Sequence, residues 1–197
     1  MTKTAAWISA TRLRTLPLSL SGILVGSAMA FTNSQFSSEI FWLAIATTLG
    51  LQILSNFAND YGDGVKGTDN DQRIGPKRAI QSGALTDKEV KKGMVYTSVV
   101  TAFFALSLIY ISFGKDDFFL SLLFIALGAA SLAAAIKYTV GDSAYGYHGL
   151  GDVFVFVFFG LVSVLGVNFL MTKEIDLWLL LPASSIGFLS SAVLNLN

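Results

Sequence analysis

The chain has 197 residues, a formal net charge of zero and no cysteine, and 53% of its residues are hydrophobic while 13% are charged. Soluble globular domains carry about 25% charged residues, so this composition, with a mean hydropathy of +0.64, indicates an integral membrane protein. The neutral charge balance gives no overall positive field for nucleic acid, and the lack of cysteine excludes disulfides, cysteine zinc sites and thiol nucleophiles.

Six apolar segments follow one another along the chain, and each is close to the ~20 residues that a membrane-spanning helix needs. They are Leu16–Phe31, Ile40–Ala58, Met94–Phe113, Phe118–Ile136, Val153–Met171 and Leu177–Leu196. Short turns join the first segment to the second, the third to the fourth and the fifth to the sixth. We therefore predict an all-α transmembrane helix bundle that forms a single domain over residues 1–197.

Two longer polar loops, at about 59–92 and about 137–152, separate the remaining segments. Lys and Arg are concentrated in these loops and at the N-terminus, whereas the opposite turns hold only Lys115 and Lys173. Basic residues are retained on the cytoplasmic side of membrane proteins. We therefore predict that the N-terminus and both long loops lie on the cytoplasmic face, and we expect the chemistry there.

The second apolar segment leads into a polar cluster within LQILSNFANDYGDGVKGTDNDQRIGPKR, which runs from Leu51 to Arg78. On a helix, at about 100° per residue, four polar residues of this stretch fall on one narrow arc. They are Gln52, Asn56, Asn59 and Asp63, with Asp60 at the edge. Polar side chains at membrane depth normally face a bundle interior or a water-filled cavity. The stripe therefore predicts a cavity with amide and carboxylate oxygens at its cytoplasmic mouth.

Oxygen ligands without His or Cys suit a hard cation, and Mg²⁺ usually binds one or two carboxylates together with water and substrate phosphates. Asn59 and Asp63 lie one helical turn apart, so both are predicted metal ligands, with Asp69 on the following loop as a third candidate. Nearby basic side chains complement phosphate oxygens. They are Lys66, Arg73, Lys77 and Arg78. We interpret the cluster as a site for a Mg²⁺-bound diphosphate; a solvated loop of mixed charge is the alternative, but it does not explain a polar stripe inside the span.

Several motifs, in order along the chain, resemble one known family. RLRTLPLSLSGILVG lies near the start, NDYGDGVKGTDND and RIGPKRAIQSGAL follow the second span, and YTVGDSAYGYHGLGDVFVFVFFG runs from Tyr138 to Gly160. Together they resemble the UbiA superfamily of intramembrane prenyltransferases, most narrowly its menaquinone-pathway branch. The first aspartate motif of that family is Asn-x-x-x-Asp-x-x-x-Asp. Asn59 and Asp63 match its first two positions, whereas Gly67 occupies the third and Asp69 lies two residues further on.

The resemblance implies nine spans and a second aspartate-rich motif after the sixth. The present sequence ends at Asn197, about where that motif is expected to begin. We therefore expect a C-terminally truncated chain that contains six of the nine spans and part of the metal site.

The resemblance also implies the reaction, in a bacterial inner membrane and with Mg²⁺ as cofactor. A polyprenyl group is transferred from polyprenyl diphosphate to 1,4-dihydroxy-2-naphthoate, with loss of CO₂ and diphosphate, to give demethylmenaquinone. A transporter or channel with a polar-lined path, and an inactive fragment, are the alternatives that the sequence leaves open.

Roles for individual residues follow from their positions in the cytoplasmic segments. The predicted catalytic residues are Asp60, Asp63, Lys137 and Asp152, of which Asp152 is either a proton acceptor or a helix-start residue. Arg12, Arg14 and Tyr138 are added to the basic residues above as substrate-binding candidates. Aromatic faces that could stabilise an allylic cation are offered by Phe57, Tyr61, Tyr138 and Tyr145.

Overall fold

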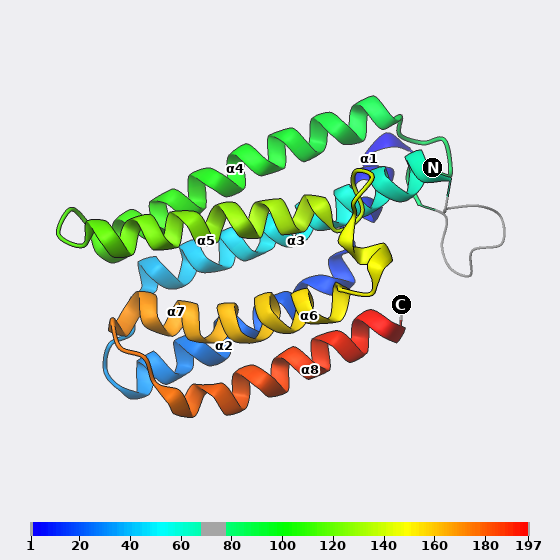
Figure 1. Ribbon diagram of the computed structural model, residues 1–197. Helices are drawn as coiled ribbons and strands as arrows, with labels where there is room; N and C mark the ends of the chain where they lie inside the picture. Colours follow the sequence, from blue (N-terminus) through cyan, green and yellow to red (C-terminus); the bar gives the residue numbers. More distant parts are fainter. Residues whose placement is uncertain (1, 68–77, 197) are drawn as a thin grey trace.

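A computed structural model of the chain describes residues 2–67 and 78–196, and its regular structure is entirely helical in that part, as predicted. In chain order the helices are α1 (Lys3–Ala10), α2 (Leu16–Thr32), α3 (Ser38–Lys66), α4 (Asp87–Phe113), α5 (Phe118–Lys137), α6 (Gly151–Val155), α7 (Ser163–Thr172) and α8 (Leu180–Leu196) (Figure 1). Short 3₁₀ turns are η1 (Leu13–Thr15), η2 (Tyr145–His148) and η4 (Leu177–Leu179). A π-helical segment, η3 (Phe156–Val162), joins α6 to α7.

Six helical stretches are long and apolar enough to cross a membrane, which confirms the predicted number. Among the long helices, α3 and α4 extend well beyond the apolar segments of the sequence. Helix α3 continues past Ala58 to Lys66, so the polar stripe is helical to its end, and α4 begins at Asp87, well before Met94. The polar residues next to the longest loop are therefore held on rigid helix ends.

Local signals fix these helix ends. The Ser37 side chain accepts a hydrogen bond from the Ile40 N–H at 3.3 Å and starts α3, while Gly67, with φ of 71°, ends it in the left-handed conformation that glycine adopts without strain. At the start of α4, Thr86 and Glu89 form a reciprocal capping box. These three helix ends are thus determined within a few residues of sequence.

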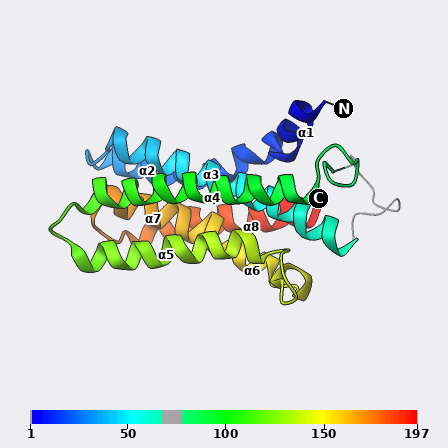
Figure 2. The same ribbon diagram turned by 90° about the horizontal axis from the view of Figure 1, so that it is seen from above.

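The long helices run side by side along one axis, as the two views in Figures 1 and 2 show. Helix α3 packs along α4, α2 along α7, and α8 along η3. Helix α1, the C-terminal end of α3, the segment from Tyr138 to Leu150 and the end of α8 lie at one end of the bundle, and the short turns lie at the other (Figure 1). The N-terminus and the second long loop therefore share an end, as the charge pattern predicts, and the assignment of that end to the cytoplasm stays a prediction.

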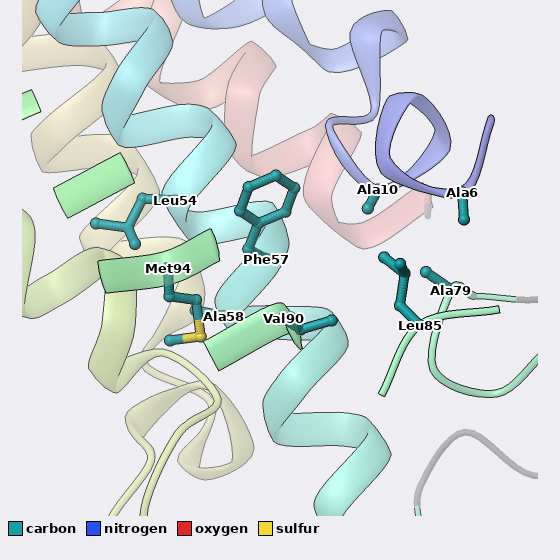
Figure 3. Packing of buried hydrophobic residues seen from close by; sticks show 9 residues of the cluster. All are labelled: Ala6, Ala10, Leu54, Phe57, Ala58, Ala79, Leu85, Val90 and Met94. Carbon is teal, nitrogen blue, oxygen red and sulfur yellow. The ribbon is translucent and has the colours of Figure 1, made fainter. Parts of the chain in front are cut away.

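Helix α1 lies against the loop-bearing end of the bundle. Its buried residues Ala6 and Ala10 belong to a hydrophobic cluster with residues of α3, of α4 and of the segment between them (Figure 3). The other members are Leu54, Phe57, Ala58, Ala79, Leu85, Val90 and Met94. Trp7 adds an edge-to-face contact with Phe57, at 5.2 Å between ring centroids. This packing fixes α1 on α3 and thereby positions the chain that follows it.

Close backbone contact between η3 and α8 depends on glycine. A Cβ atom at Gly160 would lie 2.5 Å from the Ala183 carbonyl oxygen and 2.8 Å from the Gly187 Cα. Neither neighbour is a flexible side chain, so any larger residue must push the two helices apart. The contact matters for function because η3 forms part of the cavity wall described below.

We expect Gly160→Ala to lower the free energy of unfolding by about 1–3 kcal/mol, because overpacking a close helix contact forces backbone shifts of this cost. Thermal unfolding followed by circular dichroism in mild detergent measures the loss. Gly128→Ala on α5 is the matched control, since a Cβ there meets no atom within 4 Å. Equal melting temperatures for Gly160→Ala and the parent chain would contradict the assigned role of the glycine.

Candidate functional site

A cavity of about 880 Å³ lies between α2, α3, α4, α5, η3, α7 and α8. Along α3 its lining extends from Ala44 to Asp63, a distance of about 28 Å at the helical rise of ~1.5 Å per residue. Its polar end is lined by Arg12, Asn59, Asp60, Asp63 and Arg78, and its apolar end by Ile23, Ala44, Leu108, Phe124 and Leu170. The cavity is therefore long, and its polarity changes from one end to the other.

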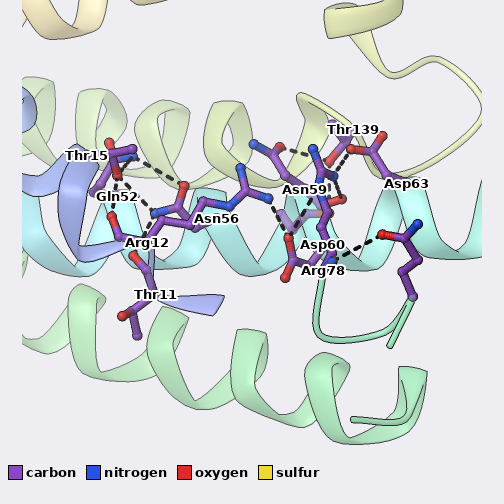
Figure 4. A network of polar contacts seen from close by, with 12 residues as sticks. Thr11, Arg12, Thr15, Gln52, Asn56, Asn59, Asp60, Asp63, Arg78 and Thr139 are labelled. Carbon is purple, nitrogen blue, oxygen red and sulfur yellow. Dashed lines mark hydrogen bonds and ion pairs between the residues drawn. The ribbon is translucent and has the colours of Figure 1, made fainter. Parts of the chain in front are cut away.

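All four residues of the predicted stripe line this cavity, together with Asp60. Figure 4 shows them in succession along α3, with their polar contacts. The helical period therefore brings together the side chains that the sequence analysis grouped.

Two ion pairs hold the carboxylates at the polar end. Arg12 Nη2 pairs with Asp60, and Arg78 Nη1 pairs with Asp63 (Figure 4). Arg78 Nε also lies 3.9 Å from Asp60 Oδ1, and its Nη1 donates to the Asn59 carbonyl at 3.3 Å. Asp60 is only 2% exposed, and a carboxylate that far from water costs several kcal/mol unless it is paired. The two arginines are therefore needed to offset the free-energy cost of placing two carboxylates here.

Arg12 reaches Asp60 because the chain bends sharply between α1 and α2. Arg12 itself has φ of 50° and ψ of 56°, the left-handed region that side chains other than glycine rarely adopt. Such strain persists only where the surroundings enforce it, and it is concentrated at functional sites. The Thr15 hydroxyl donates to the Arg12 carbonyl at 2.9 Å and so closes the bend.

Amide side chains of the stripe fasten this bend to α3. The Asn56 amide donates to the Thr11 carbonyl at 2.9 Å, and the Gln52 amide donates to Thr15 Oγ1 at 3.2 Å and to Asn56 Oδ1 at 3.4 Å (Figure 4). Asn56 is 3% exposed. The inner part of the stripe thus has a positioning role, since it holds the backbone on both sides of Arg12.

The second long loop covers the end of α3. Thr139 Oγ1 lies 2.9 Å from the Ala58 carbonyl oxygen and 3.2 Å from Asn59 Oδ1, and the Tyr147 hydroxyl donates to Asp63. Lys66 Nζ lies over the Tyr147 ring, 4.2 Å from its centroid. A Cβ at Gly62 would lie 2.6 Å from the Thr139 carbonyl oxygen, so this close approach requires glycine. Both Thr139 and Tyr147 were missed in the sequence analysis, and the unexplained helical Gly62 is the signal that points to a segment packed there.

Four aromatic rings form a continuous series on the cavity wall. Tyr138 and Tyr145 meet edge to face at 5.4 Å, Tyr145 stacks on Phe154 at 4.0 Å, and Phe154 stacks on Phe158 at 6.1 Å between centroids. The Tyr145 hydroxyl donates to the Ala134 carbonyl at 2.8 Å. Phe57 and Tyr61, also considered from the sequence, belong to or pack against the hydrophobic cluster of Figure 3 and are not among the lining residues.

Both tyrosines of this wall are neutral near pH 7. Burial, together with the nearby Asp152 and Asp63 carboxylates, raises the pKa of Tyr138. Burial, with a smaller effect of Tyr138, also raises the pKa of Tyr145. The two phenols therefore stay protonated, and they offer uncharged aromatic rings rather than phenolate bases.

The other predicted site residues are distributed around this cavity. Arg14 is exposed and lines it, whereas Lys66, Lys137 and Asp152 are exposed and are not among its lining residues. The Asp152 carboxylate accepts a hydrogen bond from the Asn195 amide at 2.8 Å. Three predicted residues lie outside the described part of the chain. They are Asp69, Arg73 and Lys77.

The donor chemistry at the polar end fits a hard cation. Asn59, Asp60 and Asp63 present amide and carboxylate oxygens within a little more than one turn of α3, without a nitrogen or sulfur ligand. Within residues 2–67 and 78–196, no group of three or more His, Cys, Asp or Glu side chains is arranged to hold a metal ion by itself. The set therefore matches an ion that takes part of its coordination shell from water or from a bound phosphate.

The sequence profile of the UbiA prenyltransferase family matches residues 19–197, which is most of the chain. The chain belongs to the UbiA prenyltransferase family. The membership agrees with the resemblance seen in the sequence motifs and with the long, apolar intramembrane cavity.

Individual family members are similar over nearly the whole chain. The 1,4-dihydroxy-2-naphthoate octaprenyltransferase of Escherichia coli (strain K12) is 44% identical over 197 residues, which are 100% of this chain and 63% of that protein. The protein of the same name from Haemophilus influenzae is 46% identical over an alignment of 200 positions, which covers 99% of this chain and 63% of that protein. UbiA prenyltransferase domain-containing protein 1 of Dictyostelium discoideum is 27% identical over an alignment of 192 positions, which covers 96% of this chain and 57% of that protein. The chain thus spans less than two thirds of the length of these relatives. No solved structure matches it significantly.

We expect Arg12→Met to lower the free energy of unfolding by about 3 kcal/mol, because it leaves the buried Asp60 carboxylate without its closest partner. The double variant Arg12→Met/Asp60→Asn removes the uncompensated charge and is expected to recover most of that loss. Urea unfolding in detergent micelles, followed by circular dichroism, measures both. Arg14→Met, an exposed arginine two residues away, is the control and is expected to change stability by less than about 0.5 kcal/mol. A double variant no more stable than the single one would show that the pair is not what holds the bend.

Proposed function

We propose that the whole protein to which this chain belongs transfers a polyprenyl group from polyprenyl diphosphate to 1,4-dihydroxy-2-naphthoate, with Mg²⁺ as cofactor, in a bacterial inner membrane. The observation that carries the proposal is the polarity of the cavity, in which paired acids and arginines at one end adjoin a long apolar channel. An amphiphile with a charged head and a hydrocarbon tail fits such a space. Family membership and the names of the similar proteins support the same reaction.

The diphosphate is assigned to the polar end. Asn59, Asp60 and Asp63 would hold Mg²⁺, with Asp69 as a further candidate, and the ion when bound neutralises charge on the leaving diphosphate. Arg12 and Arg78 line the cavity here and offer planar guanidinium donors that match phosphate oxygens. The remaining basic candidates for contact with diphosphate or with the acceptor carboxylate are Arg14, Lys66, Arg73, Lys77 and Lys137.

The polyprenyl tail is assigned to the apolar part of the cavity along α3. The whole cavity extends about 28 Å along α3, from Ala44 to Asp63 at ~1.5 Å per residue, which is close to the ~30 Å of a bilayer hydrocarbon core. At the end away from the acids its walls are mainly aliphatic and aromatic, so the tail would leave lipid for a largely apolar surface. Such a fit would hold the polyprenyl tail without specific polar contacts.

The reacting carbon is assigned to the junction between these two parts, beside the aromatic wall. As the allylic carbon–oxygen bond breaks, positive charge develops on the prenyl group, and Tyr138, Tyr145 and Phe154 present ring faces that attract a cation. The electron-rich naphthalene ring supplies the electron pair for the new carbon–carbon bond. Its carboxylate carbon leaves as CO₂, so the product is the quinol form of demethylmenaquinone and no covalent enzyme intermediate is required.

Three residues are assigned supporting roles. Tyr147 donates to Asp63 from the second loop and so orients a proposed metal ligand. Asp152, held by Asn195 near the same end, is the candidate proton acceptor for an acceptor hydroxyl. Tyr138, which belongs to the aromatic wall and lines the cavity, completes the substrate-binding set.

Asp63→Asn in the whole protein, reconstituted in liposomes, is expected to lower prenyl transfer at least 100-fold, because a carboxylate at the leaving-group end is replaced by a neutral amide. Transfer is measured as quinol product and released diphosphate, with Mg²⁺, polyprenyl diphosphate and 1,4-dihydroxy-2-naphthoate supplied. Asp116→Asn, an exposed acid at the opposite end of the bundle, is the matched control. Unchanged Mg²⁺-dependent turnover in Asp63→Asn would refute the ligand assignment, and ion flux without turnover in the parent protein would favour a transporter.

Tyr145→Leu is expected to lower kcat about tenfold, while the KM for polyprenyl diphosphate changes little, because a cation–π contact of roughly 0.5–2 kcal/mol acts only as charge develops. Tyr145→Phe keeps the ring, loses only the hydrogen bond to Ala134, and is expected to retain most of the activity. Steady-state kinetics of the pair separate the ring from the hydroxyl. If the Leu and Phe variants have equal kcat, the ring face does not stabilise the transition state.

A further inference from the structure

A second hollow, of about 450 Å³, lies on the outer surface where α1 meets the first turns of α4. Trp7 and Phe57 line it from α1 and α3, and Lys92, Gly93 and Tyr96 line it from α4. None of its lining residues belongs to the large cavity, so it is a separate site.

Aromatic packing shapes this groove. Trp7 and Phe57 meet edge to face, with 5.2 Å between their ring centroids, and a Cβ at Gly93 would lie 2.6 Å from the six-membered ring of the indole. A glycine is therefore needed for the indole to approach α4 this closely. The result is an apolar floor at the end of the bundle that carries the long loops.

The charge around the groove is predominantly positive. Lys88, Lys91 and Lys92 are exposed in the first turns of α4. Of the two acids there, Glu89 lines the groove but is paired with Lys3 at 2.6 Å, which leaves Asp87 as the other negative charge. An anion bound at Lys92 would therefore be attracted by the excess positive charge of the lysines, and Glu89, which is paired with Lys3, would repel it less than an unpaired carboxylate.

An apolar track continues from the groove along α4. Tyr96, Val99 and Phe103 are 73%, 65% and 66% exposed. Their spacing of three and four residues places them on one face of the helix, and α4 is one of the candidate membrane spans. Tyr96 begins this face one turn after Lys92, and Trp7 lines the same groove. Amphipathic rings of membrane proteins gather in this way at the level of the lipid headgroups.

We propose that this groove binds an anionic phospholipid. The phosphate lies at Lys92 and its neighbouring lysines, the glycerol region lies against Trp7 and Tyr96, and an acyl chain follows Val99 and Phe103. The assignment rests on charge complementarity and on the continuity of basic, aromatic and apolar surface at one helix end. Because Trp7 belongs to α1, a bound lipid also stabilises the docking of α1, whose end leads directly to Arg12.

Titration of the whole protein in mild detergent, followed by native mass spectrometry and thermal unfolding, tests the proposal with dioleoyl phosphatidylglycerol and dioleoyl phosphatidylcholine as probes. We expect phosphatidylglycerol to bind at least tenfold more tightly than phosphatidylcholine and to raise the melting temperature. Lys92→Gln is expected to weaken phosphatidylglycerol binding about fivefold, as for one lysine at an anionic surface. Lys115→Gln, at the opposite end of the bundle, is the matched control and is expected to have no effect.

Trp7→Phe keeps an aromatic floor and is expected to retain the lipid preference, whereas Trp7→Leu is expected to reduce it. Equal affinity for the two lipids, or unchanged affinity in Lys92→Gln, overturns the proposal. Full competition by inorganic phosphate at the same concentration assigns the site to a free anion instead. A dimer that Trp7→Leu dissociates, without lipid preference, assigns the groove to a second copy of the chain. None of these readouts depends on catalytic activity.

Discussion

The structure depends on the pairing of two acids with two arginines at the end of α3. Asp60 is almost fully buried, and its charge is tolerable in an apolar bundle only because Arg12 lies against it and Arg78 lies nearby. The two arginines come from different segments, one from the bend after α1 and one from the chain that leads to α4. Satisfying these charges therefore requires three separate parts of the chain to converge at one point.

Many of the surrounding contacts hold these three segments in place. The hydrophobic cluster fixes α1, the amides of Gln52 and Asn56 hold the bend, and the capping signals stop α3 and start α4 at defined residues. On the other side of the cavity, Phe158 on η3 lines the wall, while Gly160 of the same segment contacts α8. π-Helical turns such as those of η3 are frequent at functional sites. Here one side of η3 faces the cavity, and its other side contacts the backbone of α8.

The sequence predicts the elements whose signal is periodic. Six spans follow from apolar runs of the right length, and the cavity-lining stripe follows from a 3.6-residue spacing, which also gives the phase of Asp63 correctly. The same phase puts Phe57 and Tyr61 on other faces of α3, so their failure to line the cavity was predictable. The contact of Arg12 with Asp60 was not predictable, because it depends on a left-handed bend at a residue other than glycine. The positions of Thr139 and Tyr147 were not predictable either, because the segment between α5 and α6 holds only one short 3₁₀ turn and has no period that fixes the direction of a side chain.

Charge balance at the polar end limits how a diphosphate can be accommodated there. The carboxylates of Asp60 and Asp63 and the guanidiniums of Arg12 and Arg78 cancel in formal charge, so these four groups offer an incoming anion no net attraction. A diphosphate that displaced the carboxylates from the arginines would leave two acids unpaired at low exposure, at a cost of several kcal/mol. A divalent cation bound with the proposed diphosphate would resolve both problems, because it would supply positive charge to the acids and leave the guanidinium groups for the phosphate oxygens. Asp60, buried against the bend, and Asp63, paired with Arg78, would thus also provide oxygens of the kind that such an ion binds.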